Sequence, residues 1–162
     1  MKKHTVAATI AAVAAAGGIG YWGLTPANAP KQGISAAATV GSKAITIYSD
    51  PNCGCCETYN KYLEANGYQV TRVADPGFGE RSKAAGVPEQ GLGCHFAEID
   101  GYVVSGLVPV EIIERLVSER PNIKGITLPG MPGNAPGMAR VKTGTLKTFA
   151  FGDGGVTVYS NE

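Results

Sequence analysis

The first feature of this 162-residue sequence is the absence of acidic residues before Asp50. Lysines at positions 2, 3, 31 and 43 supply all the formal charge of that segment. Over the whole chain, 14 lysines and arginines nearly balance 13 aspartates and glutamates, so the formal net charge is only +1. A nucleic-acid binder needs a concentrated basic surface to neutralise phosphates, so we expect no nucleic-acid partner.

Cysteine is also scarce, and its distribution is uneven. The chain has 4 cysteines, which are too few for a small fold held together by a disulfide framework. Three of them lie between Cys53 and Cys56, so they are not scattered core residues. Hydrophobic residues make up 44% of the chain, which is enough to bury the core of one ordinary domain.

Residues 1–29 have the pattern of an export signal. A basic start precedes an apolar, alanine-rich and uncharged run over residues 5–21, and Ala27 and Ala29 offer small residues for a cleavage site. The alternative is an uncleaved membrane anchor over residues 5–24, because about 20 apolar residues can span a bilayer. Either form predicts a periplasmic or otherwise exported domain, in a compartment where thiols tend to oxidise.

The rest of the chain divides into a linker and one domain. Residues 30–43 are rich in alanine, glycine and serine, and they predict a flexible linker. Residues 44–160 contain the alternating strand-type and helix-type segments of a folded domain. We expect strands at 44–49, 68–73, 96–99 and 102–104, helices at 55–66, 80–85 and from Pro109 to Pro121, and a terminal hairpin of 147–151 and 156–159.

This order, β-α-β-α-β-β-α, is that of an α/β (α+β) thioredoxin-like fold. A crossover helix between the first two strands predicts that these strands are parallel. After Pro121 the chain repeats Pro-Gly-Met between Leu128 and Met138. Proline lacks the backbone donor that a helix or an interior strand needs, so we expect a rigid Pro/Gly/Met loop there.

The run Cys53-Gly54-Cys55-Cys56 lies between the first predicted strand and the helix that follows it. Three interpretations remain open. A helix N-terminus stabilises thiolates, and Cys53 and Cys56 have the spacing of a redox-active disulfide. The cysteines are also soft metal ligands, suited to Cu(I) or, without methionine, to zinc. Finally, they could form purely structural disulfides.

Other candidate ligands come from distant parts of the sequence. In a thioredoxin-like fold, the loop that contains Cys94 and His95 faces the first cysteine run. Met131 and Met138 lie in the Pro/Gly/Met loop, where there is little core for them to fill, so a thioether ligand is a reasonable hypothesis. Haem attachment is excluded because Glu57, not histidine, follows Cys56.

The combined motifs resemble a bacterial CGCC-motif family of unknown function, which includes exported copper-resistance proteins of the CopG type. The residues that carry the resemblance are the CGCC run with the preceding Tyr48 and Pro51, the segment Leu63–Gly67, Cys94-His95, the stretch Asp100–Pro109, the segment Glu119–Gly125, and the two Pro-Gly-Met repeats. The resemblance covers roughly residues 43–160. One departure is Ala139, where the family pattern leads us to expect an acidic residue.

The resemblance implies a thioredoxin-like fold, copper as the bound metal, and a role in periplasmic copper redox chemistry or detoxification. The ligands that it implies are Cys53, Cys55, Cys56, Cys94, His95 and Met131, with Met138 as a further candidate.

The sequence thus predicts an exported copper-binding protein of copper resistance, which binds Cu(I) and could interconvert Cu(I) and Cu(II) with Cys53 and Cys56 as the redox pair. Whether it acts as a copper oxidoreductase or only as a buffer is left open. Expected partners are copper ions and a copper-export or electron-transfer protein. The alternatives are a periplasmic thiol–disulfide oxidoreductase that acts on protein substrates, and a structural domain whose cysteines are all paired.

Overall fold

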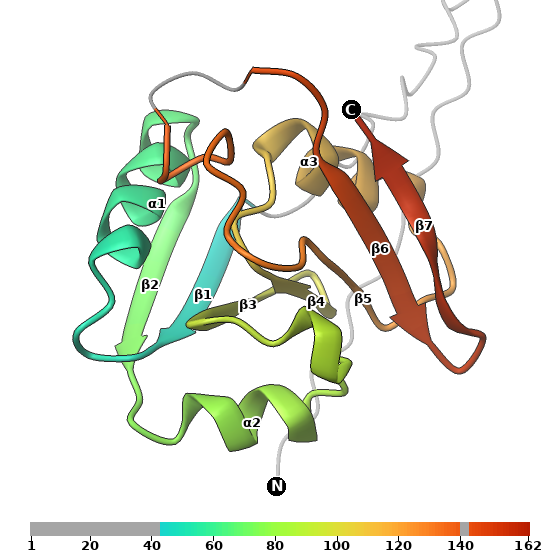
Figure 1. Ribbon diagram of the computed structural model, residues 1–162, viewed down its shortest axis with the longest axis horizontal. Coiled ribbons are helices and arrows are strands. Elements are labelled where there is room, and N and C mark those ends of the chain that lie inside the picture. The colour runs from blue at the N-terminus through green and yellow to red at the C-terminus, as the bar shows by residue number, and fades with distance from the viewer. Residues whose placement is uncertain (1–42, 140–142) are drawn as a thin grey trace, which may run out of the picture. The chain divides into compact units, whose positions relative to one another are not determined.

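The computed structural model describes residues 43–139 and 143–162 (Figure 1). The predicted export signal or anchor at 1–29 and all but the last residue of the predicted linker lie outside this part of the chain. No helix within it combines the length and the hydropathy that crossing a bilayer requires.

One seven-stranded sheet forms the centre of the domain, with the strand order β2-β1-β3-β4-β5-β6-β7. The β1–β2 and β4–β5 pairs are parallel, and the other neighbouring pairs are antiparallel. The strands are β1 (Ala44–Ser49), β2 (Gln69–Ala74), β3 (His95–Ile99), β4 (Tyr102–Ser105), β5 (Gly125–Thr127), β6 (Lys147–Gly152) and β7 (Gly155–Asn161).

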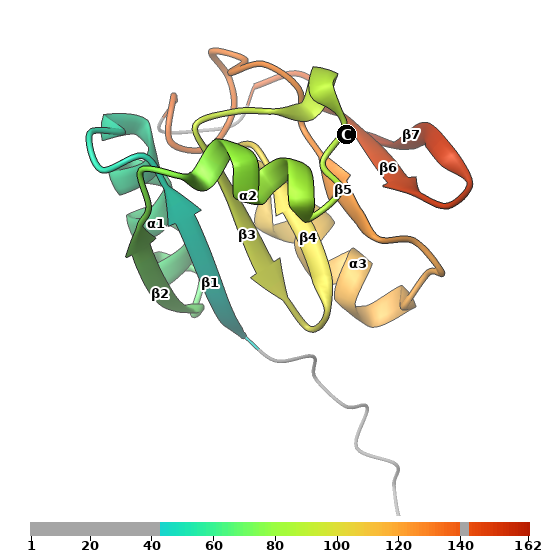
Figure 2. The same ribbon diagram turned by 90° about the horizontal axis from the view of Figure 1, so that it is seen from below.

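Three α-helices cover the two faces of the sheet, with α2 on one face and α1 and α3 on the other (Figure 2). Their bounds are α1 (Gly54–Ala65), α2 (Phe78–Ala84) and α3 (Val110–Glu119), and a short 3₁₀ helix spans Glu89–Gly91. The helix α3 follows Pro109, whose fixed φ suits a position just before a helix, and it ends at Arg120, which adopts a left-handed conformation.

The larger core lies on the face covered by α1 and α3. Tyr59 and Leu63 from α1 and Ile113 and Leu116 from α3 pack there against apolar side chains of the sheet. A smaller core around Phe96 and other apolar residues lies on the α2 face. The helices α1 and α3 thus each bury one apolar stripe, as the helical spacing of their apolar residues predicts.

The thioredoxin-like fold and the parallel first two strands are confirmed. The sequence analysis assigned no strand between α3 and the terminal hairpin, whereas β5 lies there and joins β4 to β6. This strand has three residues and starts at Gly125, where a side chain would collide with the carbonyl of Val103 and the ring of Phe151. A strand that is so short and starts with glycine has no alternating apolar pattern, so sequence periodicity does not reveal it.

Candidate metal centre

The first three cysteines are positioned by the turn that links β1 to α1. The carbonyl of Asp50 accepts a hydrogen bond from the Cys53 amide at 3.2 Å, and its carboxylate accepts one from the Asn52 amide at 2.7 Å. Cys53 is the N-cap residue of α1, so Cys55 and Cys56 lie in the first turn of the helix. The sequence prediction that the run opens this helix is confirmed.

The fourth cysteine immediately precedes β3, the strand next to β1. In the antiparallel β1–β3 pair, His95 lies opposite Ser49, and the Asp50 amide donates to the Cys94 carbonyl at 3.2 Å. The loop before Cys94 is held by two buried hydroxyls: Ser105 and Thr127 both donate to the carbonyl of Gly91, at 2.7 and 3.2 Å. Cys94 is therefore fixed from both sides, directly opposite the start of α1.

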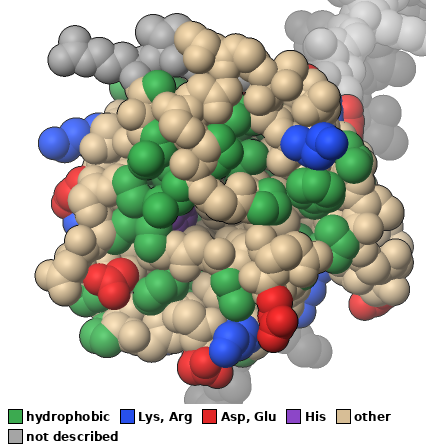
Figure 3. All heavy atoms as spheres, in the orientation of Figure 1, with side chains coloured by type: hydrophobic (Ala, Val, Ile, Leu, Met, Phe, Trp, Pro, Cys, Tyr) green, Lys and Arg blue, Asp and Glu red, His purple; other side chains and the backbone are tan. Residues whose placement is uncertain are grey.

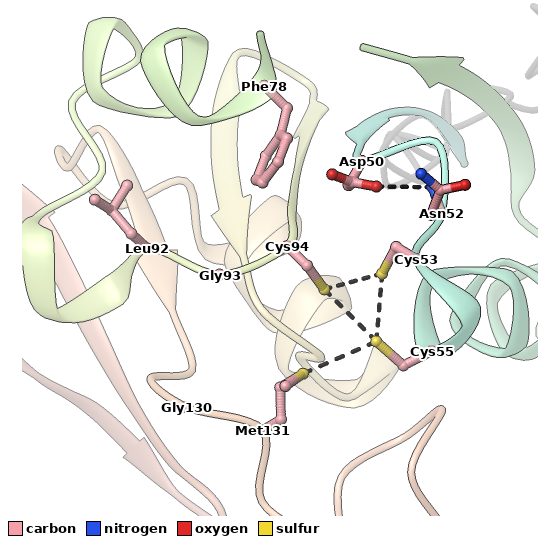
Figure 4. Close-up of a pocket in the computed structure, with 10 residues that line it drawn as sticks. All are labelled: Asp50, Asn52, Cys53, Cys55, Phe78, Leu92, Gly93, Cys94, Gly130 and Met131. Atoms are coloured by element: carbon pink, nitrogen blue, oxygen red, sulfur yellow. Dashed lines mark hydrogen bonds between the residues drawn. The ribbon is translucent and has the colours of Figure 1, made fainter. Parts of the chain in front are cut away.

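The four cysteine sulfur atoms form one group, in which all lie within 4.8 Å of one another. Figure 4 shows three of them, those of Cys53, Cys55 and Cys94. The Cys94 sulfur has the most central position, at 3.0 Å from that of Cys53, 3.4 Å from that of Cys56 and 3.5 Å from that of Cys55. A further 3.3 Å separates the sulfur atoms of Cys53 and Cys55. The sulfur atoms of Cys53 and Cys94, which are 41 positions apart in the sequence, are thus in direct contact.

Two of these cysteines are oxidised in this structure. Cys53 and Cys56 form a disulfide, whereas Cys55 and Cys94 carry free thiols. Cys56 has no exposed surface and Cys53 only 9%, while both free thiols are partly exposed. The site therefore consists of a buried disulfide and two accessible thiols beside it.

His95 lies behind the cluster and is almost fully buried. Its Nε2 is 3.2 Å from the carbonyl of Gly106, which can only accept, so Nε2 carries the proton and Nδ1 has its lone pair free. Nδ1 faces the sulfurs, at 3.4 Å from Cys56 and 3.9 Å from Cys94. Burial lowers the pKa of His95 to about 4, although the Gly106 carbonyl opposes the shift. The imidazole is therefore neutral at pH 7, which is the form that binds metals.

Burial raises the pKa of the Cys94 thiol to about 12, and the adjacent Cys55 side chain adds to the shift. In the metal-free protein at pH 7 this sulfur is accordingly protonated. A metal ion bound here must displace that proton, because the thiolate is the ligand. Metal affinity should therefore fall as the pH falls.

The two methionines of the Pro/Gly/Met loop differ in their position. The Met131 sulfur lies 3.9 Å from that of Cys55, although 54% of the Met131 surface is exposed. Met138 is 45% exposed, and among the described residues no hydrogen bond links its sulfur to the cluster. It follows Gly137, whose Cα packs so tightly on the first turn of α1 that a Cβ would meet Tyr59 at 3.2 Å. The structure thus places the Met131 sulfur beside that of Cys55, whereas the role of Met138 as a ligand stays a prediction.

A cavity of about 550 Å³ opens onto the cluster. On the face drawn in Figure 3, apolar side chains surround a hollow in which the one described histidine is just visible. Besides three cysteines and Met131, the cavity is lined by Asp50, Asn52, Phe78, Leu92, Gly93 and Gly130 (Figure 4). Sequence analysis missed these six. Asp50 and Asn52 adjoin the cysteine run and could have been noticed, whereas Phe78 and Leu92 carry no motif.

The donor set suits a soft metal ion. Four cysteine sulfurs, one thioether and one neutral imidazole nitrogen converge, and the Asp50 carboxylate is the only charged oxygen group in the cavity lining. Cu(I) prefers thiolate and thioether ligands, whereas Mg²⁺ and Ca²⁺ prefer oxygen. The residues fit copper in its reduced state once the disulfide is opened.

Comparison with solved structures gives two close matches, both described as a copper resistance protein, CopG, in form 1 and form 2. Each is 35% identical to this chain and covers 74% of it; the chain spans 96% and 97% of theirs, with TM-scores of 0.66 and 0.67. The chain belongs to this CopG family.

A family model supports the same assignment. Residues 92–138 match DUF411, a protein family of unknown function. That stretch contains Cys94, His95 and both loop methionines but not the CGCC run. No curated protein matches the chain. The resemblance noted from the motifs is therefore confirmed.

Proposed function

We propose that this chain is an exported copper-binding protein of copper resistance, which binds Cu(I) through its cysteine cluster and interconverts Cu(I) and Cu(II). The observation that carries the proposal is the convergence of four cysteine sulfurs within 4.8 Å of one another. Membership of the CopG family and the description of its solved members as copper resistance proteins support copper as the metal.

In this proposal the ligands are Cys53, Cys55, Cys56 and Cys94, with Met131 and the Nδ1 atom of His95 beside them. Met138 remains a candidate for a ligand that reaches the site only after the loop moves. Each thiol must lose its proton to bind, while the thioether and the neutral imidazole need not.

The redox step uses the pair that forms the disulfide in this structure. Two Cu(II) ions accept one electron each from the reduced Cys53 and Cys56, which join as a disulfide, release two protons and leave two Cu(I) ions. A dithiol donor returns two electrons and two protons to the disulfide and resets the site. The buried disulfide beside two free thiols is consistent with the oxidised half of this cycle.

A copper titration of the reduced protein tests the proposal. We expect tight Cu(I) binding, read by competition with a chromogenic chelator, and reduction of added Cu(II) with loss of two thiols per two copper ions. A dithiol reductant should sustain turnover beyond the amount of protein. The double variant Cys53→Ser, Cys56→Ser should bind Cu(I) at least 100-fold more weakly and reduce no Cu(II) by this route.

In that variant the hydroxyl that replaces the Cys56 thiol can donate to the Nδ1 atom of His95, so we expect the fold to survive. Far-ultraviolet circular dichroism checks this. Parent-like copper affinity in a folded double variant would remove the pair from the metal site.

One observation also favours the second candidate, a thiol–disulfide oxidoreductase. The Cys53–Cys56 disulfide has the spacing and the position at the start of α1 that suit this chemistry. That function predicts insulin reduction by metal-free protein, unaffected by Cys55→Ser. Inactivity in this assay, together with tight copper binding, would favour the copper function.

A further inference from the structure

One lining residue of the cavity has no structural reason to be glycine. Gly93 precedes Cys94, is exposed, and does not have a positive φ. A Cβ built on it would meet no atom closer than 4.0 Å, the carbonyl oxygen of His95. By contrast, Gly130 across the cavity has a φ of 72°, a conformation that favours glycine. Where neither the backbone nor the packing requires a glycine, close approach of another backbone is a physical reason for one.

The backbone of Gly93 is also available for pairing. Neither its amide nor its carbonyl has a hydrogen-bond partner among the described residues. Directly after it the chain bends at Cys94 and enters β3 at His95, so the free amide and carbonyl of Gly93 lie just before the strand. Unpaired main-chain groups can recognise an extended peptide through hydrogen bonds, with side-chain pockets adding specificity.

The walls of the cavity define the chemistry of such a peptide. Phe78 and Leu92 supply apolar surface on one side, and the sulfurs of Cys55 and Met131 lie on another (Figure 4). Asp50 is the only carboxylate in the lining, and no lysine or arginine lines the cavity. An acidic segment would therefore be repelled, whereas a neutral or basic one with an apolar side chain would fit.

From these features we propose that the cavity is the docking site for an extended, methionine-bearing and non-acidic segment of a protein that donates Cu(I). This inference rests on the proposed copper function and identifies the class of partner that loads the site. A methionine suits the position because its thioether binds Cu(I) but, unlike a cysteine, cannot form a mixed disulfide with Cys55 or Cys94.

The transfer itself is a ligand exchange without a redox change. Cu(I) leaves the thioether of the docked segment and binds the Cys55 sulfur, whose proton goes to water. Met131, 3.9 Å from that sulfur and half exposed at the cavity, offers the next thioether. The contacts that hold the segment are made by the Gly93 backbone and the cavity walls and not by copper, so docking can be measured on metal-free protein.

A pair of glycine variants provides the test. Gly93→Val places a branched side chain in the cavity mouth without a steric conflict in the protein itself. The matched control is Gly154→Val in the turn between β6 and β7, where a Cβ also meets nothing within 4 Å and the φ is not positive. The probe is a blocked seven-residue peptide with a central methionine flanked by lysines, titrated calorimetrically into the full-length, metal-free protein.

We expect millimolar or tighter binding to the parent and to Gly154→Val, and at least tenfold weaker binding to Gly93→Val. A peptide with glutamates in place of the lysines should bind at least tenfold more weakly to the parent. When the peptides are loaded with Cu(I), the methionine peptide should transfer copper to the parent faster than to Gly93→Val. Direct Cu(I) titration without peptide should give equal affinities for the parent and both variants.

Three results would overturn the inference: no peptide binding by the parent, equal binding by Gly93→Val, or equal binding of the glutamate peptide. A loss of direct copper affinity in Gly93→Val would overturn it as well, because the glycine would then serve the metal site. If the parent binds peptide but no copper, the proposed copper function fails, and the inference of a copper-donating partner fails with it.

Discussion

Cys94 occupies the most central position in the cluster, and it comes from a different chain segment than the other cysteines. Its sulfur lies within 3.5 Å of all three others, so we expect its loss to affect every metal bound there. Cys94→Ser should weaken Cu(I) binding by at least tenfold, measured by chelator competition. Because the side chain is partly exposed, the free energy of unfolding in urea should change by less than about 1 kcal/mol. Unchanged copper affinity would exclude Cys94 as a ligand.

The exposed position of Met131 separates a ligand role from a packing role. Met131→Leu keeps nearly the same volume, and at a site that is 54% exposed it should alter the unfolding free energy by no more than about 0.5 kcal/mol. It should weaken Cu(I) binding, with a larger relative loss near pH 5 than near pH 7.5, because thiolates take up protons in acid and a thioether does not.

Met138→Leu is the matched control, since this methionine is similarly exposed and no hydrogen bond joins its sulfur to a cysteine among the described residues. We expect a smaller effect on copper binding from this change. If Met131→Leu binds copper like the parent at both pH values, the loop methionine is not a ligand.

Buried His95 predicts a pH dependence of stability in the metal-free protein. Its pKa is about 4 in the folded state against 6.5 as the ordinary value, so the unfolded chain takes up a proton first as the pH falls. The stability from the neutral imidazole is complete above pH 6.5 and is lost as the pH falls toward 4. This loss amounts to about 3 kcal/mol between pH 7.5 and pH 4.

Urea unfolding across this range measures the effect, and His95→Gln is the comparison. Glutamine has no proton to gain here and can still donate to the Gly106 carbonyl. The difference between the two pH profiles should flatten below pH 4. Parallel profiles for parent and variant would show that His95 does not carry the effect.

At the scale of elements, β5 joins the thioredoxin-like part of the sheet to the terminal hairpin. Gly125 starts this strand, and a side chain there would collide with the Val103 carbonyl and the Phe151 ring. Gly125→Ala should therefore destabilise the protein by more than about 2 kcal/mol in urea unfolding.

Gly154→Ala, in the open turn of the hairpin, should have an effect within about 0.5 kcal/mol. An equal effect of the two substitutions would mean that the close approach at Gly125 is relieved by small shifts of the backbone.

Local patterns predicted most elements because they act within a few residues. The apolar positions Tyr59 and Leu63 recur at helical spacing, and both are buried as expected. The strand β5 escaped because three residues contain no period, and because its pairing partners are distant in sequence.

The site shows the same division. The disulfide partners Cys53 and Cys56 follow from spacing, and Cys94 and His95 follow once the fold is assigned. The cavity walls cannot be predicted in this way, since Phe78 and Leu92 are brought to the cluster only by the three-dimensional fold. The different positions of Met131 and Met138 also depend on the path of the loop, which proline and glycine content alone does not specify.

At the scale of the whole molecule, the oxidation state of the cluster should set its copper capacity. The metal-free oxidised protein should react with two equivalents of a thiol reagent, and mass spectrometry should identify the unmodified pair as Cys53 and Cys56. After reduction by a dithiol, four thiols should react, and the amount of Cu(I) bound per chain should rise. Two disulfides that resist mild reductant would instead favour a purely structural role for the cysteines.

The cluster draws its sulfurs from three separate segments: the start of α1, the start of β3 and the loop after β5 (Figure 4). Residues 53 and 94 are 41 positions apart, and 55 and 131 are 76 apart. In an unfolded chain, bringing these residues together costs the entropy of closing two long loops. In the proposed function, a newly made chain therefore presents only the local CGCC run to copper, and the complete donor set exists only after folding. We expect a metal bound by all three segments to hold them together and so to oppose unfolding.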